Sequence, residues 1–499
     1  MRPWMILQER LMLNQMPPLD RLADAIELHQ IGELSRAAEL YRRTINRYPK
    51  NADAWHLLGL IAHQQKNNKL AVKLIKTAID IQPNTADFHN NLGRVYNALG
   101  NDMDYFEYRR SIELNPNHVK ALSNLAGSLR SKGEFYAAID YAIRATKIDP
   151  EDEEAHNNLG NALKDINKIE DAIIAYNRAI ELNPDYALAH WNLSLALLTL
   201  GRYEEGFKEM MWRWKWDGFA SKLREFNQPR LTKLIGLDNE LSGKSLLLYA
   251  EQGLGDTIHF IRYAALLRQI DVNVIFECPE ALIPLLKNSN LVNQIISPGS
   301  KLPKFDFHAP LLDLPFLFKT CEDDIPQKIP YLVVPSHVSN KWKKKIDNVE
   351  GFKVGINWQG NNQSPVERFR RILPADLEKL ASINGVVWFS LQKGSDHDNT
   401  SKFSDNFPII ETGSEALIET AGLIQTLDLV ITSDTAIAHL AGSLGKPVWI
   451  LLHHSPDWRW RTTGSINSWY PSARLFRQSK PGNWETVIEE VFISLKNTI

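Results

Sequence analysis

The chain has 499 residues, is 44% hydrophobic and 23% charged, and has a formal net charge of −2, because 57 Lys and Arg stand against 59 Asp and Glu. At roughly 150 residues per domain, this length predicts about three domains, and the composition is that of an ordinary globular protein. The charge balance argues against a nucleic-acid-binding protein, and the two cysteines are too few for a disulfide framework or a thiolate metal site.

No apolar run reaches the ~18 residues that a membrane-spanning helix needs. Residues 1–19 contain a short apolar patch that Gln8, Glu9 and Arg10 interrupt, so they lack the apolar core of a secretory signal peptide. We therefore expect a cytoplasmic protein with no membrane span, in which residues 1–19 are an N-terminal segment ahead of the first domain.

Residues 20–210 contain an internal repeat of 33 or 34 residues, marked by prolines that stand in phase: Pro49, Pro83, Pro116, Pro150 and Pro184. Seventeen residues after four such turn positions, the first of them implied near residue 15, stand the glycines Gly32, Gly100, Gly133 and Gly201. Five residues before the prolines stand the small residues Thr44, Ala78, Ser111, Ala145 and Ala179.

Each of these repeated features has a mechanical role in a pair of packed helices. A proline cannot continue a helix and therefore ends each unit. A glycine permits the tight turn inside the pair, and a small side chain lets the two helices approach. The pattern resembles the tetratricopeptide repeat, to whose consensus residues 155–184 (AHNNLGNALKDINKIEDAIIAYNRAIELNP) are close. The resemblance predicts an α-solenoid, which normally offers a concave binding surface rather than a catalytic site.

A second register within the repeats carries asparagines, each followed by leucine: Asn91, Asn124, Asn158 and Asn192. Identical positions of successive first helices stack along the inner groove, and a carboxamide can both donate to and accept from a peptide group. The row therefore predicts binding of an extended protein acceptor, although asparagine is also a tolerated polar residue at an exposed helix position. The row is similar to the asparagine ladder of the O-GlcNAc transferases, where it holds the protein acceptor.

The composition of the sequence changes after Met210. Residues 211–220 (MWRWKWDGFA) are aromatic and basic, and we interpret 211–244 as a junction that packs the last repeat helix onto the next domain. A cation–π cluster is the alternative interpretation of this stretch.

From residue 245 onward, short apolar β-rich runs alternate with amphipathic helices, which is typical of parallel doubly wound sheets. We expect strands at SLLLY, VNVIFE, VGINW, VVWFSL, DLVIT, PVWILL and ARLFRQ, and helices at 257–269, 375–384, 415–427 and 435–444. A polar, lysine-bearing stretch at 336–351 divides this half into two Rossmann-like domains, 245–345 and 346–499. Two such domains create a cleft at the carboxyl ends of their strands, where ligands bind.

A glycine-containing loop follows the first of these strands and precedes a helix. Its third glycine position holds Ile258, so the loop does not match a dinucleotide fingerprint, and a nicotinamide cofactor is disfavoured. The loop presents Asp256 at the mouth of the predicted cleft. A carboxylate there can accept a proton from an acceptor hydroxyl, or it can serve only as the cap of the helix.

A second loop, Ser433-Asp434-Thr435, joins a buried strand to the helix at 435–444. Backbone amides at a helix N-terminus suit a diphosphate. Asp434 then suits a sugar hydroxyl or the ordering of the loop better than a phosphate. His439, one turn into the helix, is more often a packing residue than a ligand-binding one.

A third loop, after the strand at 354–358, holds Trp358 and Gln359 and is followed by Arg368, Arg370 and Arg371. Arginine forks bind diphosphate oxygens in pairs, although such a run is usually a solvated basic face. Asp396-His397-Asp398 matches the short D-x-D pattern of metal-dependent transferases, but we interpret it as coincidental. No His, Glu or Cys set in the sequence has the spacing of metal ligands.

The order of six segments carries a resemblance to a known family: EQGLGDTIHFIRYAALL, VGINWQGN, WFSLQKG, DLVITSDTAIAHLAGSLGKPVW, SPDWRWRTTG and SWYPSARLFRQ. It resembles bacterial tetratricopeptide-linked glycosyltransferases, whose catalytic half is similar to the ADP-heptosyltransferases (glycosyltransferase family nine). The resemblance implies a GT-B fold and an inverting, metal-independent transfer from a nucleotide-sugar. It assigns the base to Asp256 and the donor loop to Asp434-Thr435, with Ala436 in place of a glycine. The family's phosphate-binding lysine is best matched by Arg370 or Arg371.

The sequence thus predicts an enzyme of protein glycosylation, with Asp256 as catalytic base and no metal or other cofactor. The predicted donor-binding residues are Gly255, Trp358, Gln359, Arg370, Arg371, Ser433, Asp434, Thr435, Ala436 and His439. The repeats, through Asn91, Asn124, Asn158 and Asn192, would present the acceptor. Two alternatives remain: a scaffold whose transferase-like half is inactive, and a transferase of cell-surface polysaccharide assembly whose acceptor is a glycan.

Overall fold

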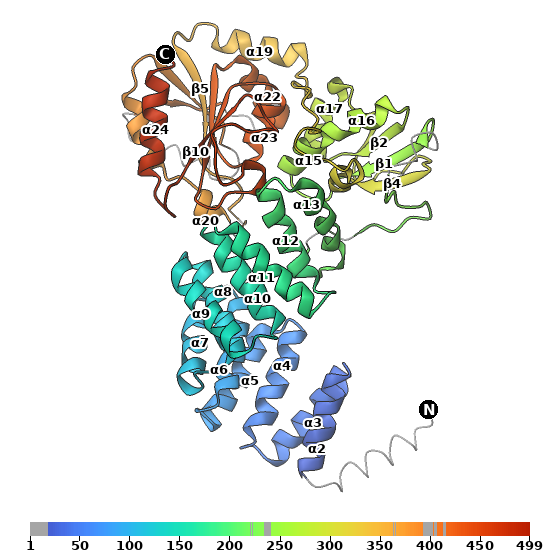
Figure 1. Ribbon diagram of the computed structural model, residues 1–499, viewed down its shortest axis with the longest axis vertical. Helices are drawn as coiled ribbons and strands as arrows, with labels where there is room; N and C mark the ends of the chain where they lie inside the picture. The colour runs from blue at the N-terminus through green and yellow to red at the C-terminus, as the bar shows by residue number, and fades with distance from the viewer. Residues whose placement is uncertain are drawn as a thin grey trace. The chain divides into compact units, whose positions relative to one another are not determined.

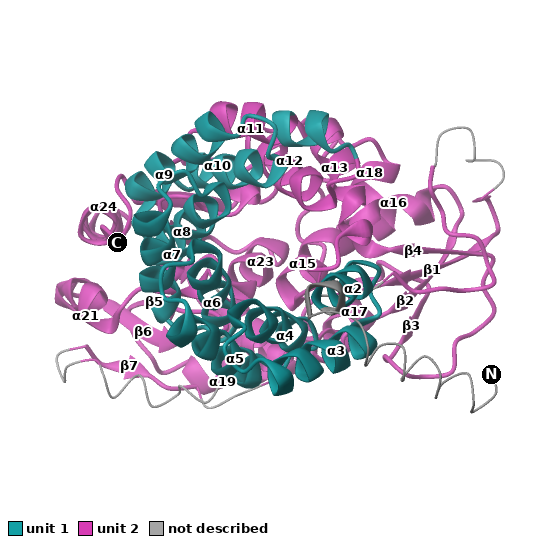
Figure 2. Cartoon of the chain, turned by 90° about the horizontal axis from the view of Figure 1, so that it is seen from below, with its two compact units in different colours: residues 1–165, 178–184 teal, residues 166–177, 185–499 magenta. Residues whose placement is uncertain are grey.

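The computed structural model describes residues 18–499 except 220, 222, 234–240, 363, 365, 393–402, 404–406 and 413–415. Helices make up the N-terminal part, and parallel sheets with helices make up the rest (Figure 1). The chain forms two compact units: the first contains the residues up to 165 and 178–184, and the second contains 166–177 and 185–499 (Figure 2). The domain boundaries expected from the sequence stay predictions.

The repeats form a tetratricopeptide solenoid of paired helices, as the spacing of the prolines predicts. The pairs are α2 (Pro18–Gln30) with α3 (Leu34–Arg47), α4 (Ala52–Gln64) with α5 (Asn68–Ile81), α6 (Ala86–Ala98) with α7 (Met103–Leu114), α8 (Val119–Ser131) with α9 (Phe135–Ile148), α10 (Glu153–Asp165) with α11 (Ile169–Leu182), and α12 (Ala187–Thr199) with α13 (Tyr203–Met210). Within the first unit, α4, α6, α8 and α10 lie on the inner side of the curved stack (Figure 2).

The turn inside each pair contains one residue with a left-handed backbone. Two of these residues are not glycine: Lys66 has a φ of 62° and Asn167 a φ of 61°. The glycine positions confirm the turn that the sequence predicts, with φ values of 85°, 64°, 81° and 78° at Gly32, Gly100, Gly133 and Gly201. Glycine adopts this conformation at no steric cost, whereas a lysine does so only at a cost.

The small residues before the prolines lie where paired helices meet, as expected. Their exposed fractions are 5% for Thr44 and 0% for Ala78, Ser111, Ala145 and Ala179. A larger side chain at these positions would force the helices apart, because protein interiors are close-packed.

The described residues of the second unit form two parallel sheets. The first has the order β3-β2-β1-β4, with β1 (Ser245–Tyr249), β2 (Asn273–Glu277), β3 (Gln294–Ile296) and β4 (Phe307–Pro310). The second has the order β10-β9-β8-β5-β6-β7, with β5 (Phe352–Asn357), β6 (Val386–Ser390), β7 (Ile409–Ile410), β8 (Leu429–Ser433), β9 (Val448–Leu452) and β10 (Ala473–Arg477). All seven strands expected from the sequence are present. The strands β3, β4 and β7 were not expected, because they are too short to give an apolar pattern.

Short helices connect and cover these strands. They are α15 (Leu254–Phe260), η2 (Ile261–Tyr263), α16 (Ala264–Gln269), η3 (Glu280–Leu282), α17 (Ile283–Ser289), η4 (Leu311–Asp313), α18 (Leu314–Leu317), α19 (Ser336–Ile346), α20 (Glu367–Arg370), α21 (Pro374–Leu377), η5 (Glu378–Ser382), α22 (Leu417–Thr426), α23 (Ala436–Ser443), η7 (Trp458–Trp460) and α24 (Glu485–Lys496). The helix expected at 257–269 is divided into α15, η2 and α16, and the one expected at 375–384 into α21 and η5.

The lysine-bearing stretch at 336–351 contains a packed helix rather than only a divider. In α19, Val338, Trp342 and Ile346 are buried at intervals of four residues, and the helix packs against α22. The indole N–H of Trp342 donates to Glu419 of α22 at 2.7 Å. The exposed lysines therefore cover one face of an ordinary amphipathic helix.

The junction after α13 continues into η1 (Met211–Lys215), where Arg213 is fully buried. Its Nη2 lies 2.8 Å from Oε1 of Glu251 and 2.6 Å from Oδ1 of Asp313. Its guanidinium also lies 4.3 Å from the centre of the Trp214 ring. The junction therefore contains a cation–π contact, which was the alternative interpretation, together with buried ion pairs. Arg213 thus ties η1 to the carboxyl end of β1, which is followed by the loop that carries Asp256.

Candidate functional site

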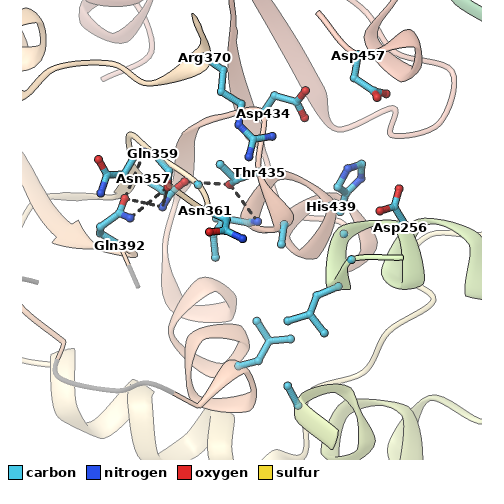
Figure 3. A pocket seen from close by; sticks show the side chains of 18 of the residues that line it. Asp256, Asn357, Gln359, Asn361, Arg370, Gln392, Asp434, Thr435, His439 and Asp457 are labelled. Carbon is cyan, nitrogen blue, oxygen red and sulfur yellow. Dashed lines mark hydrogen bonds between the residues drawn. The ribbon is translucent and has the colours of Figure 1, made fainter. Parts of the chain in front are cut away.

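A cavity of about 960 Å³ lies in the second unit at the carboxyl ends of β1, β5, β6 and β8. Asp256 and α15 lie on one side of it, and residues from the second sheet and from α23 lie on the other (Figure 3). This is the place where parallel sheets bind ligands, because the loops after the strands converge there. The cavity brings together the predicted base and seven of the predicted donor-binding residues: Asp256 with Gly255, Gln359, Arg370, Asp434, Thr435, Ala436 and His439.

Asp256 lies in the first turn of α15, whose N-cap is Gly253. The backbone N–H groups of Gly253 and of Asp256 itself lower the pKa of the carboxyl group, and the capping role of Asp256 stays a prediction. The same carboxylate faces the cavity, and about 24% of the side chain is exposed. Burial raises the pKa of Asp256, although Arg459 acts in the opposite direction. Capping and proton acceptance are therefore compatible roles for one side chain.

Arg459, in η7, was not identified from the sequence. Its Nη2 donates to Oδ1 of Asp256 at 2.6 Å, and its Nη1 donates to Oδ1 of Asp457 at 2.9 Å. The guanidinium also lies 4.5 Å from the centre of the Trp458 ring and 5.2 Å from that of Phe260. The signal was present in the segment SPDWRWRTTG, but only as a family motif. Arg459 holds Asp256 in place and brings one buried positive charge to the cavity wall.

Asp434 and Thr435 connect β8 to α23 and have different roles. Thr435 is the N-cap of α23, and its hydroxyl accepts the N–H of Ile437 at 3.3 Å. Asp434 lines the cavity and is only 8% exposed. Its burial and the nearby charge of Asp457 raise its pKa to about 6. At neutral pH its protonation is thus easily shifted by a bound anion or cation.

An amide network that the sequence did not reveal joins the ends of three strands. Asn357, at the end of β5, donates through Nδ2 to Oε1 of Gln392 at 2.9 Å. Its Oδ1 accepts from the hydroxyls of Thr435 at 2.9 Å and Thr432 at 3.1 Å. The backbone N–H of Gln359 also donates to Oε1 of Gln392, at 3.3 Å. Because these groups are buried and bonded to one another, they fix the floor of the cavity.

Of the two candidate arginines, only Arg370 lines the cavity. It belongs to α20, and its Nε donates to Oε2 of Glu367 at 2.6 Å. Arg371 is exposed and lies outside the cavity lining. The adjacent residues differ because Arg370 ends the short helix, while Arg371 begins extended backbone with a ψ of 133°.

Trp358 and Ser433 are not part of the cavity lining either, and their predicted role in donor binding stays a prediction. Trp358 is 1% exposed and packs edge-on against Phe403, with ring centres 5.1 Å apart. Ser433 is fully buried as the last residue of β8. Side chains alternate between faces along an extended chain, and their neighbours Gln359 and Asp434 are the residues that reach the cavity.

His439 lies one turn into α23 and lines the cavity while being 6% exposed. Its Nδ1 lies 3.0 Å from the hydroxyl of Tyr470. A Cβ at position 255 would lie 2.9 Å from Cδ2 of His439. Gly255 is therefore required by the close approach of the histidine ring rather than by its backbone angles. His439 is both a packed residue and a cavity residue.

The asparagines of the repeats are partly engaged within the solenoid. Nδ2 of Asn91 lies 3.0 Å from Nε2 of His56, and Nδ2 of Asn124 donates to Oδ1 of Asn90 at 2.9 Å. Each bond joins the first helix of one repeat to the first helix of the repeat before it. Asn158 is half-buried, and Asn192 is 8% exposed. Their role in acceptor binding stays a prediction, and the carboxamides also hold successive repeats together.

Among the residues that the structure describes, no three His, Cys, Asp or Glu side chains gather in a way that could hold a metal ion. Asp396-His397-Asp398 lies outside the described residues, and metal independence stays a prediction. In the same described part of the chain, no helix is both long and apolar enough to cross a membrane.

Comparisons with known proteins identify the repeats. A family model described as "Tetratricopeptide repeat" matches residues 22–84, and one described as "TPR repeat" matches residues 160–201. Protein FlbA from Caulobacter vibrioides is 24% identical over 481 residues, which cover 90% of this chain and 73% of FlbA. The chain therefore contains tetratricopeptide repeats, followed by a region of parallel sheets. Such repeats indicate interaction with a protein partner.

Several solved structures are similar to part of the chain, among them YrrB and the pilF protein. YrrB, described as a TPR protein with an unusual peptide-binding site, is 23% identical, with a TM-score of 0.30, covering 36% of this chain and 94% of YrrB. The pilF protein of Pseudomonas aeruginosa is 22% identical, with a TM-score of 0.30, covering 32% of this chain and 75% of pilF.

Proposed function

We propose that this protein is a glycosyltransferase that moves a sugar from a nucleotide-sugar to a hydroxyl group of a protein. The observation that carries the proposal is the cavity at the carboxyl ends of two parallel sheets, with a carboxylate on one side and a helix N-terminus with an arginine on the other. The resemblance to heptosyltransferase-like enzymes assigns the same two sides to base and donor. The GT-B fold and the enzymatic activity are parts of this proposal.

The donor side of the cavity offers two kinds of group to an anion. The first turn of α23 presents backbone N–H groups, of which Ile437 N–H is already bonded to Thr435. Arg370 contributes a guanidinium whose Nε is bonded to Glu367, which leaves its outer N–H groups for a phosphate oxygen. The amide network around Asn357 provides a rigid floor beneath the same position.

The proposed reaction needs one base and a stabilised leaving group. The acceptor hydroxyl gives its proton to Asp256 as its oxygen forms a bond with the anomeric carbon. At the same time the bond between that carbon and the phosphate oxygen breaks, and its electron pair leaves with the nucleotide. The positive charges and N–H groups of the donor side stabilise the departing anion. Attack from the side opposite the leaving group inverts the anomeric centre, and no metal is needed for the charge balance.

The repeats supply the acceptor in this proposal. A solenoid binds along its concave side, and the asparagine row of the first helices lies in the repeats that carry it. Each carboxamide that bonds a neighbouring repeat still has capacity for a peptide group, because it has two N–H donors and an oxygen with two lone pairs.

The direct test is incubation of the purified protein with a panel of nucleotide-sugars, with released nucleotide and labelled protein acceptor as two separate readouts. We expect nucleotide release from one donor in the presence of excess EDTA, and transfer to an extended protein segment. A variant with all four asparagines changed to alanine should lose transfer, by roughly 0.5–1.5 kcal/mol for each net hydrogen bond lost, and keep the slow hydrolysis of the donor.

The alternative function is that of a scaffold, and the repeats are the observation that favours it. No nucleotide release from any donor, together with retained binding of a protein partner by the repeats, would support the scaffold. Release with transfer only to a glycan would support the polysaccharide-assembly alternative. Loss of donor hydrolysis in the asparagine variant would indicate that the changes had unfolded the repeats.

A further inference from the structure

A buried hydrogen-bond cluster lies behind the cavity wall that contains His439. The hydroxyl of Tyr470 lies 3.0 Å from Nδ1 of His439 and 3.2 Å from Nδ1 of His259. It also lies 3.4 Å from the hydroxyl of Tyr331, which in turn lies 3.0 Å from Nη2 of Arg262. Of these side chains, His439 is the one that lines the cavity. The hydrogens that matter in this cluster are the ring N–H of each histidine and the hydroxyl hydrogens of the two tyrosines.

Each histidine in the cluster is neutral and therefore carries one N–H. Burial lowers the pKa of His259 and of His439 well below the ordinary value, and Arg262 and Arg459 act in the same direction. In a neutral imidazole one ring nitrogen donates and the other accepts. The nitrogen of His439 that carries the hydrogen depends on the hydrogen bonds of its neighbours.

His259 decides the arrangement, because its Nε2 is buried and has no hydrogen-bond partner among the described residues. If Nε2 carried the hydrogen, a buried N–H would be left without an acceptor, which is rare in proteins. With the hydrogen on Nδ1, His259 donates to the oxygen of Tyr470 and leaves only a lone pair without a partner. His259 is therefore the Nδ1–H tautomer, and it donates to Tyr470.

The hydroxyl hydrogen of Tyr470 then goes to His439. Tyr331 donates to the carbonyl oxygen of Ile258 at 2.9 Å, because a carbonyl can only accept. The oxygen of Tyr331 also accepts from Arg262, and it lies farther from Tyr470 than Nδ1 of His439 does, at 3.4 Å against 3.0 Å. The nearer acceptor is Nδ1 of His439, so the hydrogen of this ring is on Nε2.

Nε2 of His439 is on the cavity side of the ring. The Cδ2–Nε2 edge faces Gly255, since a Cβ at that position would lie 2.9 Å from Cδ2 and 3.6 Å from Nε2. Gly255 lines the cavity and precedes Asp256 in the chain; Figure 3 shows His439 and Asp256 at the same side of the cavity. We propose that Tyr470 and His259 are positioning residues that fix His439 as the tautomer whose Nε2–H donates into the cavity, to a phosphate oxygen of the nucleotide-sugar.

The phosphate partner in this inference rests on the proposed function, whereas the tautomer does not. The inference therefore has two parts that can be tested independently. The first is that the hydrogen of His439 is on Nε2 in the free protein. The second is that this N–H meets a phosphate group when the cavity is filled.

The first experiment is nuclear magnetic resonance of the full chain with isotope-labelled histidine, in which ring couplings identify the protonated nitrogen. A His439→Gln variant assigns the resonance. We expect His439 to carry its hydrogen on Nε2 and His259 on Nδ1, and we expect Tyr470→Phe to shift His439 toward a mixture of tautomers. An Nδ1–H signal from His439, or an unchanged tautomer in Tyr470→Phe, would overturn the positioning role.

The second experiment adds inorganic pyrophosphate to the same sample. We expect the Nε2 resonance of His439 to move in a saturable way, and this movement to be weaker in Tyr470→Phe. A resonance that stays in place while pyrophosphate binds, as isothermal titration calorimetry of the same protein would show, would remove phosphate as the partner of His439. This experiment needs no transferase activity, so it can succeed or fail whatever the outcome of the nucleotide-sugar panel.

If the panel identifies a donor, kinetics add a matched pair of variants. The amide of Gln reaches the position of Nε2, whereas the amide of Asn reaches that of Nδ1. We expect His439→Gln to stay within about tenfold of the unchanged protein in kcat and His439→Asn to lose on the order of 10²-fold, as for the loss of one donor to a developing anion. Equal losses in both variants would indicate that only the size of the ring matters.

Discussion

The turns of the solenoid and the wall of the cavity differ in how far apart along the chain their residues lie. A repeat turn is made by residues within one segment of about a dozen, for example Asn97, Gly100 and Asp104, with Nδ2 of Asn97 donating to Oδ2 of Asp104 at 3.1 Å. The cavity wall instead joins Asp256 to Arg459 across 203 positions of sequence. The solenoid is therefore built from repeated local contacts, while the cavity depends on single long-range ones. We expect single substitutions to have large effects in the cavity and small effects in the solenoid.

The largest effect is expected for Asp256→Asn. The variant keeps a side-chain oxygen for the backbone hydrogen bond from Gly253 but loses the proton acceptor, so transfer should fall by roughly 10²- to 10⁴-fold while donor binding is retained. Because burial raises the pKa of Asp256 and its ionised form is required, transfer by the unchanged protein should fall as the pH drops through that pKa. The measurement is the initial rate of transfer over a pH series.

The matched control for this variant is Asp53→Asn, since Asp53 is also an acid in the first turn of a helix, α4, but in the repeats. It should leave the rate unchanged. If Asp256→Asn transfers sugar as fast as the Asp53→Asn control does, Asp256 is only a helix cap.

The next effect concerns stability and is expected for Arg213→Ala. The substitution leaves the buried Glu251 without its cation, while Asp313 keeps its ion pair with Arg230. Breaking a buried pair costs about 3–5 kcal/mol. Urea unfolding of the full chain, followed by tryptophan fluorescence, measures this loss. Lys215→Ala is the control, because the Lys215 side chain is 61% exposed in its ion pair. Equal stability of the two variants would show that the buried cluster is not needed to hold η1.

The next effect, on donor binding, is expected to be smaller than the loss of stability in Arg213→Ala, and it should distinguish Arg370 from Arg371. Arg370→Ala should weaken donor binding by about 1.5–3 kcal/mol, the usual contribution of a hydrogen bond to a charged group, whereas Arg371→Ala should leave it unchanged. Isothermal titration calorimetry with the donor identified by the panel measures both. The opposite ranking would place the phosphate outside the cavity.

The same difference in sequence separation explains what the sequence could predict. The repeat turns follow from Gly100 and its equivalents because a left-handed residue is a local requirement. The loop of Asp256 was also predictable, since glycines, an acid and a helix follow one strand directly. In both cases all the information lies within one short segment.

The rest of the site could not be predicted, because it depends on which segments meet. Nothing near Arg459 in the sequence indicates that it pairs with Asp256, and Asn357 gains its role only when β5 lies between β6 and β8. Trp358 was assigned to the cavity because it follows a strand, yet the alternation of an extended chain points it into the core. The side of the chain that faces a ligand is a property of the packed sheet.

The smallest effect is expected in the solenoid, at a pair of side chains that joins α6 and α7. Nδ1 of His89 lies 2.7 Å from Oε2 of Glu107, and Nε2 lies 3.0 Å from the carbonyl oxygen of Pro83. A carboxylate and a carbonyl both only accept, so both ring nitrogens must carry hydrogens and the ring is an imidazolium. Burial lowers the pKa of His89, but the hydrogen bonds to Glu107 and Pro83 outweigh it, and the pKa is raised overall.

A histidine whose pKa is raised on folding stabilises the fold fully below its unfolded-state pKa, and this stabilisation is lost as the pH rises through the folded-state value. The opening free energy of α6 and α7, measured by amide hydrogen exchange and corrected for intrinsic rates, should therefore decline by about 1 kcal/mol as the pH rises across the histidine range. His89→Gln should remove this decline. His156→Gln should keep it, because His156 lies in another repeat, where its Nε2 lies 3.0 Å from the equivalent carbonyl oxygen of Pro150. A decline that persists in His89→Gln would locate the titrating group elsewhere. A decline that extends to α4 and α10 would show that the repeats open as one unit, and that the solenoid is less local than its turns indicate.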